Sequence, residues 1–272
     1  SLVGSEMCIR DRYTTTRSFH ILYYIILHAS IDCNQQLAIF NMKTIFLILL
    51  FVQFVSSTAS NNRNRLWQLP AKSTAVVTGG TKGIGHAIVS ELGLSFGCKI
   101  LTCARNEKEL NECIKEWQEK GCDVRGCVAD ISTTEGRSSL MDAVKDLIND
   151  DDCANPGKLD ILINNVGTNI RKPSIEYTED DLEFVMKTNF KSFFEVTKLC
   201  HPYLIREKVE GHNYCKQTSS VVNIGSVAGV VCIKSGTPYA ATKAAMNQLT
   251  GNWACEWGPL GIRVNCVTPW YI

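Results

Sequence analysis

The chain has 272 residues, of which 45% are hydrophobic and 20% are charged, a balance typical of a globular protein. Its formal net charge is +1, so it lacks the basic excess of a nucleic-acid-binding protein, and no nucleic-acid partner is predicted. The 13 cysteines show neither CxxC nor Cys/His ligand spacing, which favours buried structural thiols over disulfides or a metal site.

The front of the chain differs in pattern from the rest. Residues 1–41 resemble translated upstream sequence, and we set them aside as a non-native leader. Residues 42–60 have the layout of a secretory signal peptide, with Met42 as a start; apolar mistranslated sequence is the alternative. The apolar run is shorter than the roughly 20 residues that a membrane span needs, so no stable span is expected. Residues 61–71 are predicted to be a linker.

The two sequence features that bear on localisation disagree. A signal peptide would direct the protein into the secretory pathway. The cysteine-rich body favours a reducing compartment such as the cytoplasm. Both localisations therefore stay open.

From residue 72 onward, strand patterns alternate with helix patterns. Strands are expected at residues 74–78, 99–103, 123–129, 159–163, 221–224 and 262–267. Helices are expected at residues 86–96, 107–120, 138–149, 178–199 and 239–257. The alternation predicts an α/β fold, a doubly wound parallel sheet of the Rossmann type over residues 72–272 that stops after its sixth strand.

A glycine-rich turn joins the first strand to the first helix. Gly79, Gly83 and Gly85 allow a tight turn and the close approach of a phosphate group. The start of the following helix presents free backbone N–H groups and the positive end of the helix dipole. The turn therefore indicates a site for a nucleotide phosphate.

Tyr239 and Lys243 lie four residues apart on an expected helix, so their side chains share a face. A phenol with a pKa of about 10 is a poor proton donor near neutral pH. An ammonium about 5 Å away, at an effective dielectric constant of about 20, favours the phenolate by roughly 3 kcal/mol. Taken alone, the pair is also what an ordinary amphipathic helix carries, so the other motifs decide its interpretation.

Residues 78–85 match the TGxxxGIG fingerprint of the short-chain dehydrogenase/reductase family without exception. Asn164-Asn165-Val166-Gly167 is similar to the family's NNAG signature, with valine in place of alanine, and Ser226 precedes Tyr239 by the family's thirteen residues. The resemblance covers residues 72–272. Finer similarity, as in Cys103-Ala104-Arg105-Asn106 and Ala254-Cys255-Glu256-Trp257, points to the tropinone reductase-like branch.

The resemblance implies a nicotinamide cofactor. An acid at the end of the second strand would hold the ribose of NAD, but Arg105 stands there, with Lys82 in the glycine turn, which favours NADP(H). The alternative for Arg105 is that it merely caps a strand in solvent. Asp130 is expected at the adenine amino group; its alternative role is the N-cap of the next segment, a place that Ser132 or Thr133 could take instead. The implied cofactor-binding residues are Thr78, Gly79, Thr81, Lys82, Gly83, Ile84, Gly85, Arg105, Asp130, Asn165, Gly167, Tyr239, Lys243 and Pro269.

The resemblance also implies a catalytic set of Asn189, Ser226, Tyr239 and Lys243. Tyr239 is expected to donate a proton to a carbonyl oxygen that Ser226 steadies. Lys243 is expected to lower the pKa of the tyrosine and to bind the nicotinamide ribose. The backbone carbonyl of Asn189 is expected to hold a relay water. Without the resemblance, the helical pattern places Asn189 on a helix surface.

The expected activity is NADPH-dependent reduction of a small ketone. A 3-oxoacyl-[acyl-carrier-protein] reductase uses the same motifs, and a non-catalytic NADP-binding protein or an inactive fragment is the contrasting alternative. Family members continue beyond the sixth strand with a substrate-covering segment and a strand that helps to assemble oligomers. The resemblance therefore implies that the chain is a fragment and that the full-length protein is a homo-oligomer, a dimer or a tetramer.

Overall fold

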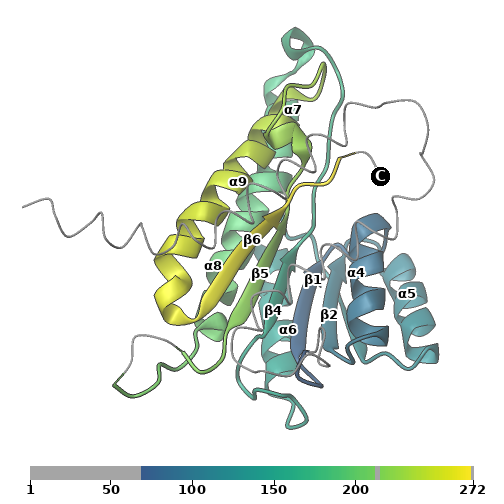
Figure 1. Cartoon of the computed structure of the whole chain (residues 1–272). Coiled ribbons are helices and arrows are strands. Elements are labelled where there is room, and N and C mark those ends of the chain that lie inside the picture. Colours follow the sequence, from purple (N-terminus) through teal and green to yellow (C-terminus); the bar gives the residue numbers. More distant parts are fainter. Residues whose placement is uncertain (1–68, 212–214, 271–272) are drawn as a thin grey trace, which may run out of the picture. The chain divides into compact units, whose positions relative to one another are not determined.

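The computed structural model describes residues 69–211 and 215–270. The expected leader, the signal peptide and all but the last residues of the linker lie outside this part. Within it, six strands form one sheet in the order β3-β2-β1-β4-β5-β6, and all neighbouring strands are parallel (Figure 1). The strands are β1 (Thr74–Thr78), β2 (Lys99–Ala104), β3 (Val124–Val128), β4 (Ile161–Asn164), β5 (Ser219–Ile224) and β6 (Ile262–Val267). The predicted doubly wound Rossmann fold is confirmed.

Helices cover both faces of the sheet. Side chains of α4 (Gly83–Leu94) and α5 (Glu107–Glu119) form one apolar cluster with it, and those of α6 (Thr134–Ile148), α8 (Ser192–Leu204) and α9 (Thr237–Trp257) form the other. Successive β1 residues alternate between the two clusters, Ala75 and Val77 in the first and Val76 in the second. Because both faces are covered, β1 is buried along its whole length, as expected of a parallel strand.

Threonine side chains cap two of the helices. Thr178 and Asp181 form a capping box at the start of α7 (Glu179–Met186). The hydroxyl of Thr133 accepts a hydrogen bond of 3.0 Å from the backbone N–H of Gly136, so α6 begins four residues earlier than expected. The expected start was late because the first turn of α6 is largely polar and gives little apolar periodicity.

A π turn, η2 (Lys187–Lys191), separates α7 from α8. It changes the phase of the helical faces, and Asn189 within it is fully buried. The expectation from helical periodicity that Asn189 lies on a helix surface is therefore wrong. Such π turns occur frequently at functional sites.

A buried chain of amide and hydroxyl groups ties α8 and α9 to the sheet. Asn164 of β4 donates to Thr197 of α8 and to Asn223 of β5, both at 2.9 Å. Asn223 in turn donates to Thr250 of α9 at 2.9 Å. Because buried polar groups must be paired, these contacts fix where α9 packs on β5.

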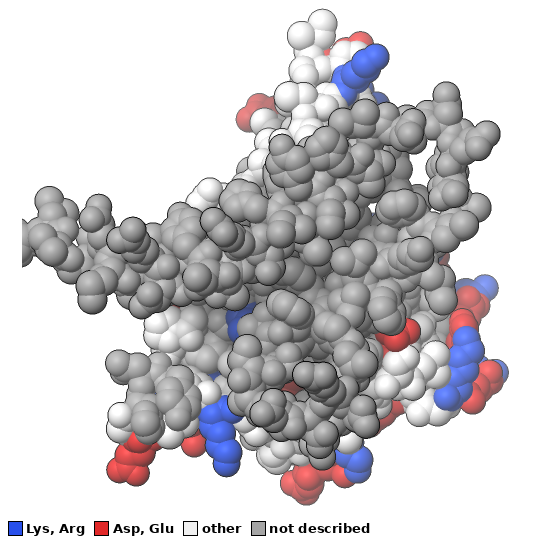
Figure 2. All heavy atoms as spheres, in the orientation of Figure 1, with Lys and Arg blue, Asp and Glu red and all other residues white. Residues whose placement is uncertain are grey.

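The strand order reverses between β1 and β4, which is where ligands bind in folds of this type. On the face seen in Figure 2, positive and negative side chains are mixed over α5, where Lys120 and Glu116 form an ion pair of 2.6 Å. No helix in residues 69–211 and 215–270 is long and apolar enough to cross a membrane. Every cysteine in those ranges is a free thiol.

Candidate active site

Two adjoining cavities lie at the carboxyl edge of the sheet. The first has a volume of about 900 Å³ and is lined by the glycine turn and the ends of β2, β3 and β4. The second has a volume of about 650 Å³ and is lined by the ends of β5 and β6 and the start of α9. Both are lined by Ile84, Asn165, Gly167 and Thr168, so they form one continuous groove.

The glycine turn leaves the start of α4 open to the first cavity. Gly79 has a φ of 71°, in the left-handed region that favours glycine. A Cβ on Gly85 would lie 2.2 Å from the carbonyl oxygen of Gly79, so a side chain there would push the turn apart. The first turn of α4 has no side-chain cap and no acidic residue. Its N–H groups therefore suit an anion such as a phosphate.

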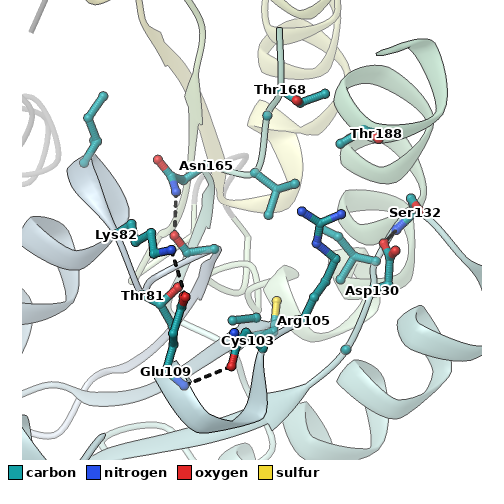
Figure 3. Close-up of a pocket in the computed structure, with 18 of the residues that line it drawn as sticks. Thr81, Lys82, Cys103, Arg105, Glu109, Asp130, Ser132, Asn165, Thr168 and Thr188 are labelled. Atoms are coloured by element: carbon teal, nitrogen blue, oxygen red, sulfur yellow. Dashed lines mark hydrogen bonds and ion pairs between the residues drawn. The ribbon is translucent and has the colours of Figure 1, made fainter. Parts of the chain in front are cut away.

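Two cations, Lys82 and Arg105, and two carboxylates, Glu109 and Asp130, line the first cavity. Figure 3 shows Arg105 reaching from the end of β2 toward Thr188, with Asp130 beside it. Lys82 forms an ion pair of 2.9 Å with Glu109. Burial raises the pKa of Asp130, but hydrogen bonds from Ser132 outweigh that effect and, with the charge of Arg105, hold the pKa below its ordinary value. The alternative role of Asp130 as the N-cap of α6 is wrong, because Thr133 holds that position.

Asn165 joins the glycine turn to the end of β4. Its side-chain Nδ2 donates to the carbonyl oxygens of Thr78 and Gly79, both at 3.0 Å. Its backbone N–H donates to the hydroxyl of Thr78 at 2.9 Å. Thr78 is itself buried and does not line either cavity, nor do Gly83 and Gly85, so these residues shape the turn from behind.

Tyr239 and Lys243 lie on the first two turns of α9 and line the second cavity. The Nζ of Lys243 lies 5.7 Å from the centre of the Tyr239 ring and donates to the carbonyl oxygen of Ile224 at 2.6 Å. The lysine is only 3% exposed. Burial lowers its pKa to about 8, although the nearby Cys266 thiol acts in the opposite direction. The structure thus places a buried ammonium beside a phenol that faces a cavity.

Ser226 follows β5 and also lines the second cavity. Its Oγ accepts a hydrogen bond of 3.1 Å from the backbone N–H of Ala228. Because the oxygen acts there as an acceptor, the O–H remains available as a donor. Pro269 lines the same cavity, and its carbonyl oxygen accepts from the N–H of Val227 at 3.0 Å.

Asn189 lies behind the wall shared by the two cavities. Its Oδ1 accepts from the N–H of Thr168 at 2.7 Å, and its Nδ2 donates to the carbonyl oxygen of Thr168 at 2.8 Å and to the Thr242 hydroxyl at 3.2 Å. A Cβ on Gly167 would lie 3.4 Å from the Lys243 Nζ and 3.7 Å from the Asn189 Oδ1. Gly167 therefore lies within van der Waals distance of both side chains.

Residues 73–272 match the family model described as short chain dehydrogenase. The chain belongs to the short-chain dehydrogenase family. A tropinone reductase homolog of Arabidopsis thaliana is 47% identical over 209 residues, which cover 77% of this chain and 72% of that protein. A tropinone reductase homolog of Datura stramonium is 43% identical over 209 residues, which cover 77% of this chain and 71% of that protein. These relatives confirm the predicted tropinone reductase-like branch.

Solved structures of short-chain dehydrogenases have the same fold. A dehydrogenase/reductase from Sinorhizobium meliloti superposes with a TM-score of 0.63 at 28% identity, covering 75% of this chain and 73% of that one. A variant actinorhodin polyketide ketoreductase with NADPH also gives 0.63 at 28% identity, covering 74% of this chain and 71% of that one.

Some residues that line the groove of this short-chain dehydrogenase were not predicted. Thr188 and Ser132 line the first cavity. Thr188 is next to Asn189 in the sequence, and Ser132 is two residues after Asp130, and both of those residues were predicted. Arg171, Cys232 and Lys234 line the second cavity from loops. These loops carry no periodic pattern, so no signal in the sequence marked them.

Proposed function

We propose that this short-chain dehydrogenase is an NADPH-dependent reductase of small ketones. The observation that carries the proposal is the convergence of Ser226, Tyr239 and the buried Lys243 on one cavity. That cavity, the second one, is continuous with the first cavity, which Lys82 and Arg105 line. A proton donor and a dinucleotide site therefore adjoin each other.

The turn and the cations that line the first cavity support NADPH as the cofactor. The uncapped start of α4 would hold the pyrophosphate, and the tight approach of Gly85 to Gly79 keeps the turn free of side chains. Arg105 would hold the 2′-phosphate, with Lys82 beside it, and no acidic residue occupies the end of β2. When bound, NADPH supplies a hydride to the carbonyl carbon of the substrate.

The chain's own residues supply the proton and the hydrogen bonds in this proposal. The phenolic O–H of Tyr239 donates its proton to the carbonyl oxygen as the hydride arrives. The O–H of Ser226 donates a hydrogen bond to the same oxygen and stabilises the charge that develops on it. The ammonium of Lys243 attracts the phenolate that is left, and a water at the Asn189 backbone carbonyl would return the proton.

Replacing Tyr239 by phenylalanine tests this function. Loss of a positioned general acid lowers rates by about 10² to 10⁴, so NADPH-linked reduction of cyclohexanone should fall by at least a hundredfold. The ring stays in place, and the dissociation constant for NADPH should therefore change by less than about threefold, or 0.7 kcal/mol. Tyr203→Phe on α8, outside both cavities, is the matched control. A Tyr239→Phe variant that keeps a tenth of the wild-type rate would remove the proton-donor role.

A further inference from the structure

The second cavity carries positive charge that no acidic lining residue balances. Arg171, Lys234 and Lys243 line it, and no Asp or Glu does so among residues 69–211 and 215–270. The first cavity differs, because Glu109 and Asp130 lie there beside the cations. Of the two cavities, only the second, which Tyr239 lines, therefore has an excess of positive charge.

Arg171 and Lys234 are both exposed, and neither forms an ion pair with any described residue. Lys172, the next residue after Arg171, is different. It pairs with Asp181, lies 5.3 Å from the centre of the Tyr177 ring and does not line the cavity. Of these two consecutive cations, only Arg171 offers its charge to a ligand.

The loops that carry Arg171 and Lys234 touch each other at two points. A Cβ on Gly236, two residues after Lys234, would lie 2.9 Å from the side-chain Oδ1 of Asn169. The hydroxyls of Ser174 and Thr237 lie 2.7 Å apart. These contacts lie on either side of Arg171 in the sequence, so both cations belong to one rim of the cavity, which Tyr239 also lines.

We infer that the substrate of this enzyme is a carbonyl compound that also bears an anionic group such as a carboxylate. Arg171 and Lys234 hold the anion while the carbonyl oxygen meets Tyr239 and Ser226. The inference rests on the proposed reductase function and names its substrate class. Charges near a protein surface attract or repel strongly enough to change binding tenfold. The rim therefore selects against ketones with a protonated amine, which includes tropinone itself.

Three cyclohexanones that differ only in the group opposite the carbonyl test the inference. The group is a carboxylate, a methyl or a dimethylamino group, and kcat/KM is measured for each with NADPH. We expect kcat/KM for the carboxylate compound to be at least tenfold higher than for the methyl compound. The difference from the amine compound should be larger still. The preference should shrink as salt is raised, because salt screens exposed charges. Equal values for the three compounds, or a preference for the amine, would overturn the inference.

Charge-removing variants assign the preference to particular residues. Arg171→Gln combined with Lys234→Gln should lower kcat/KM for the carboxylate at least tenfold and leave the methyl compound within about threefold, or 0.7 kcal/mol. Lys172→Gln is the matched control, because that cation is already paired, and it should behave like the wild type. A double variant that still prefers the carboxylate would show that Arg171 and Lys234 do not hold it.

A binding measurement separates failure of this inference from failure of the proposed function. Cyclohexanecarboxylate and cyclohexylammonium cannot be reduced, and calorimetry measures their binding to the protein with NADPH. One outcome is that no ketone is reduced, but cyclohexanecarboxylate binds tenfold more tightly than cyclohexylammonium, and only when Arg171 and Lys234 are present. In that case the anion site is supported and the reductase function is refuted. If the carboxylate has no such advantage, the anion site fails whatever the turnover.

Discussion

Replacing Lys243 by methionine should change how the stability of the protein depends on pH. Burial of this side chain lowers its pKa from an ordinary 10.5 to about 8. Each pKa unit corresponds to about 1.4 kcal/mol. Keeping the protonated lysine in the folded chain near neutral pH therefore costs about 3 kcal/mol. Methionine has a similar length and no charge, so it removes this cost.

The sign of the effect follows from proton binding. The pKa of Lys243 is lower in the folded chain than in the unfolded chain, so the unfolded chain binds more protons between about pH 8 and pH 10.5. The free energy of unfolding of the wild type gains this contribution as pH rises through that window. The variant lacks it. The variant also loses the hydrogen bond to Ile224, which costs about 1 to 3 kcal/mol at every pH and does not alter the slope.

Urea unfolding of the cofactor-free protein at a series of pH values measures the difference. Between about pH 7 and pH 10.5, the stability of the wild type relative to Lys243→Met should rise by about 3 kcal/mol. Lys108→Met, at an exposed lysine of α5, is the matched control and should follow the wild type. Parallel curves for the wild type and Lys243→Met would refute the interpretation of Lys243 as a buried ammonium without a balancing charge.

Two further variants test the first cavity. Gly85→Ala places a methyl group 2.2 Å from the Gly79 carbonyl, so it should destabilise the protein by about 1 to 3 kcal/mol in thermal unfolding and weaken NADPH binding at least tenfold; unchanged binding would show that the turn does not cradle the cofactor. Arg105→Asp exchanges a cation for the acid that suits NAD. In titrations of both cofactors it should favour NADH over NADPH by at least tenfold relative to the wild type, and an unaltered ratio would exclude Arg105 from cofactor choice.

The parts of the molecule that the sequence predicted are those whose signals are local. An apolar run such as that of β1 is buried on both faces, and the glycine turn after it needs particular backbone conformations, so both leave clear marks in the sequence. The right-handed connections of parallel strands then limit the strand order to a few possibilities. The pairing of Tyr239 with Lys243 likewise needs only helical spacing.

The parts that escaped prediction depend on contacts between distant residues. Burial of Asn189 requires a π turn, and its amide bonds reach Thr168 and Thr242, which are far away in the sequence. Arg206, in the connection after α8, is buried and pairs with Asp160, 46 residues earlier in the chain, at 2.7 Å. Periodicity within one segment cannot reveal such partners, because the contacts arise only when the chain is folded.

The most direct test of the central claim follows the hydride itself. The wild-type protein is incubated with cyclohexanone and with NADPH that carries deuterium at the transferable position, and the alcohol is analysed by mass spectrometry. A reductase that works through the Tyr239 cavity yields an alcohol with a single deuterium on the carbinol carbon. Alcohol without deuterium would contradict direct transfer from the cofactor. A failure to form alcohol from this ketone and from its carboxylate-bearing analogue would contradict the reductase function.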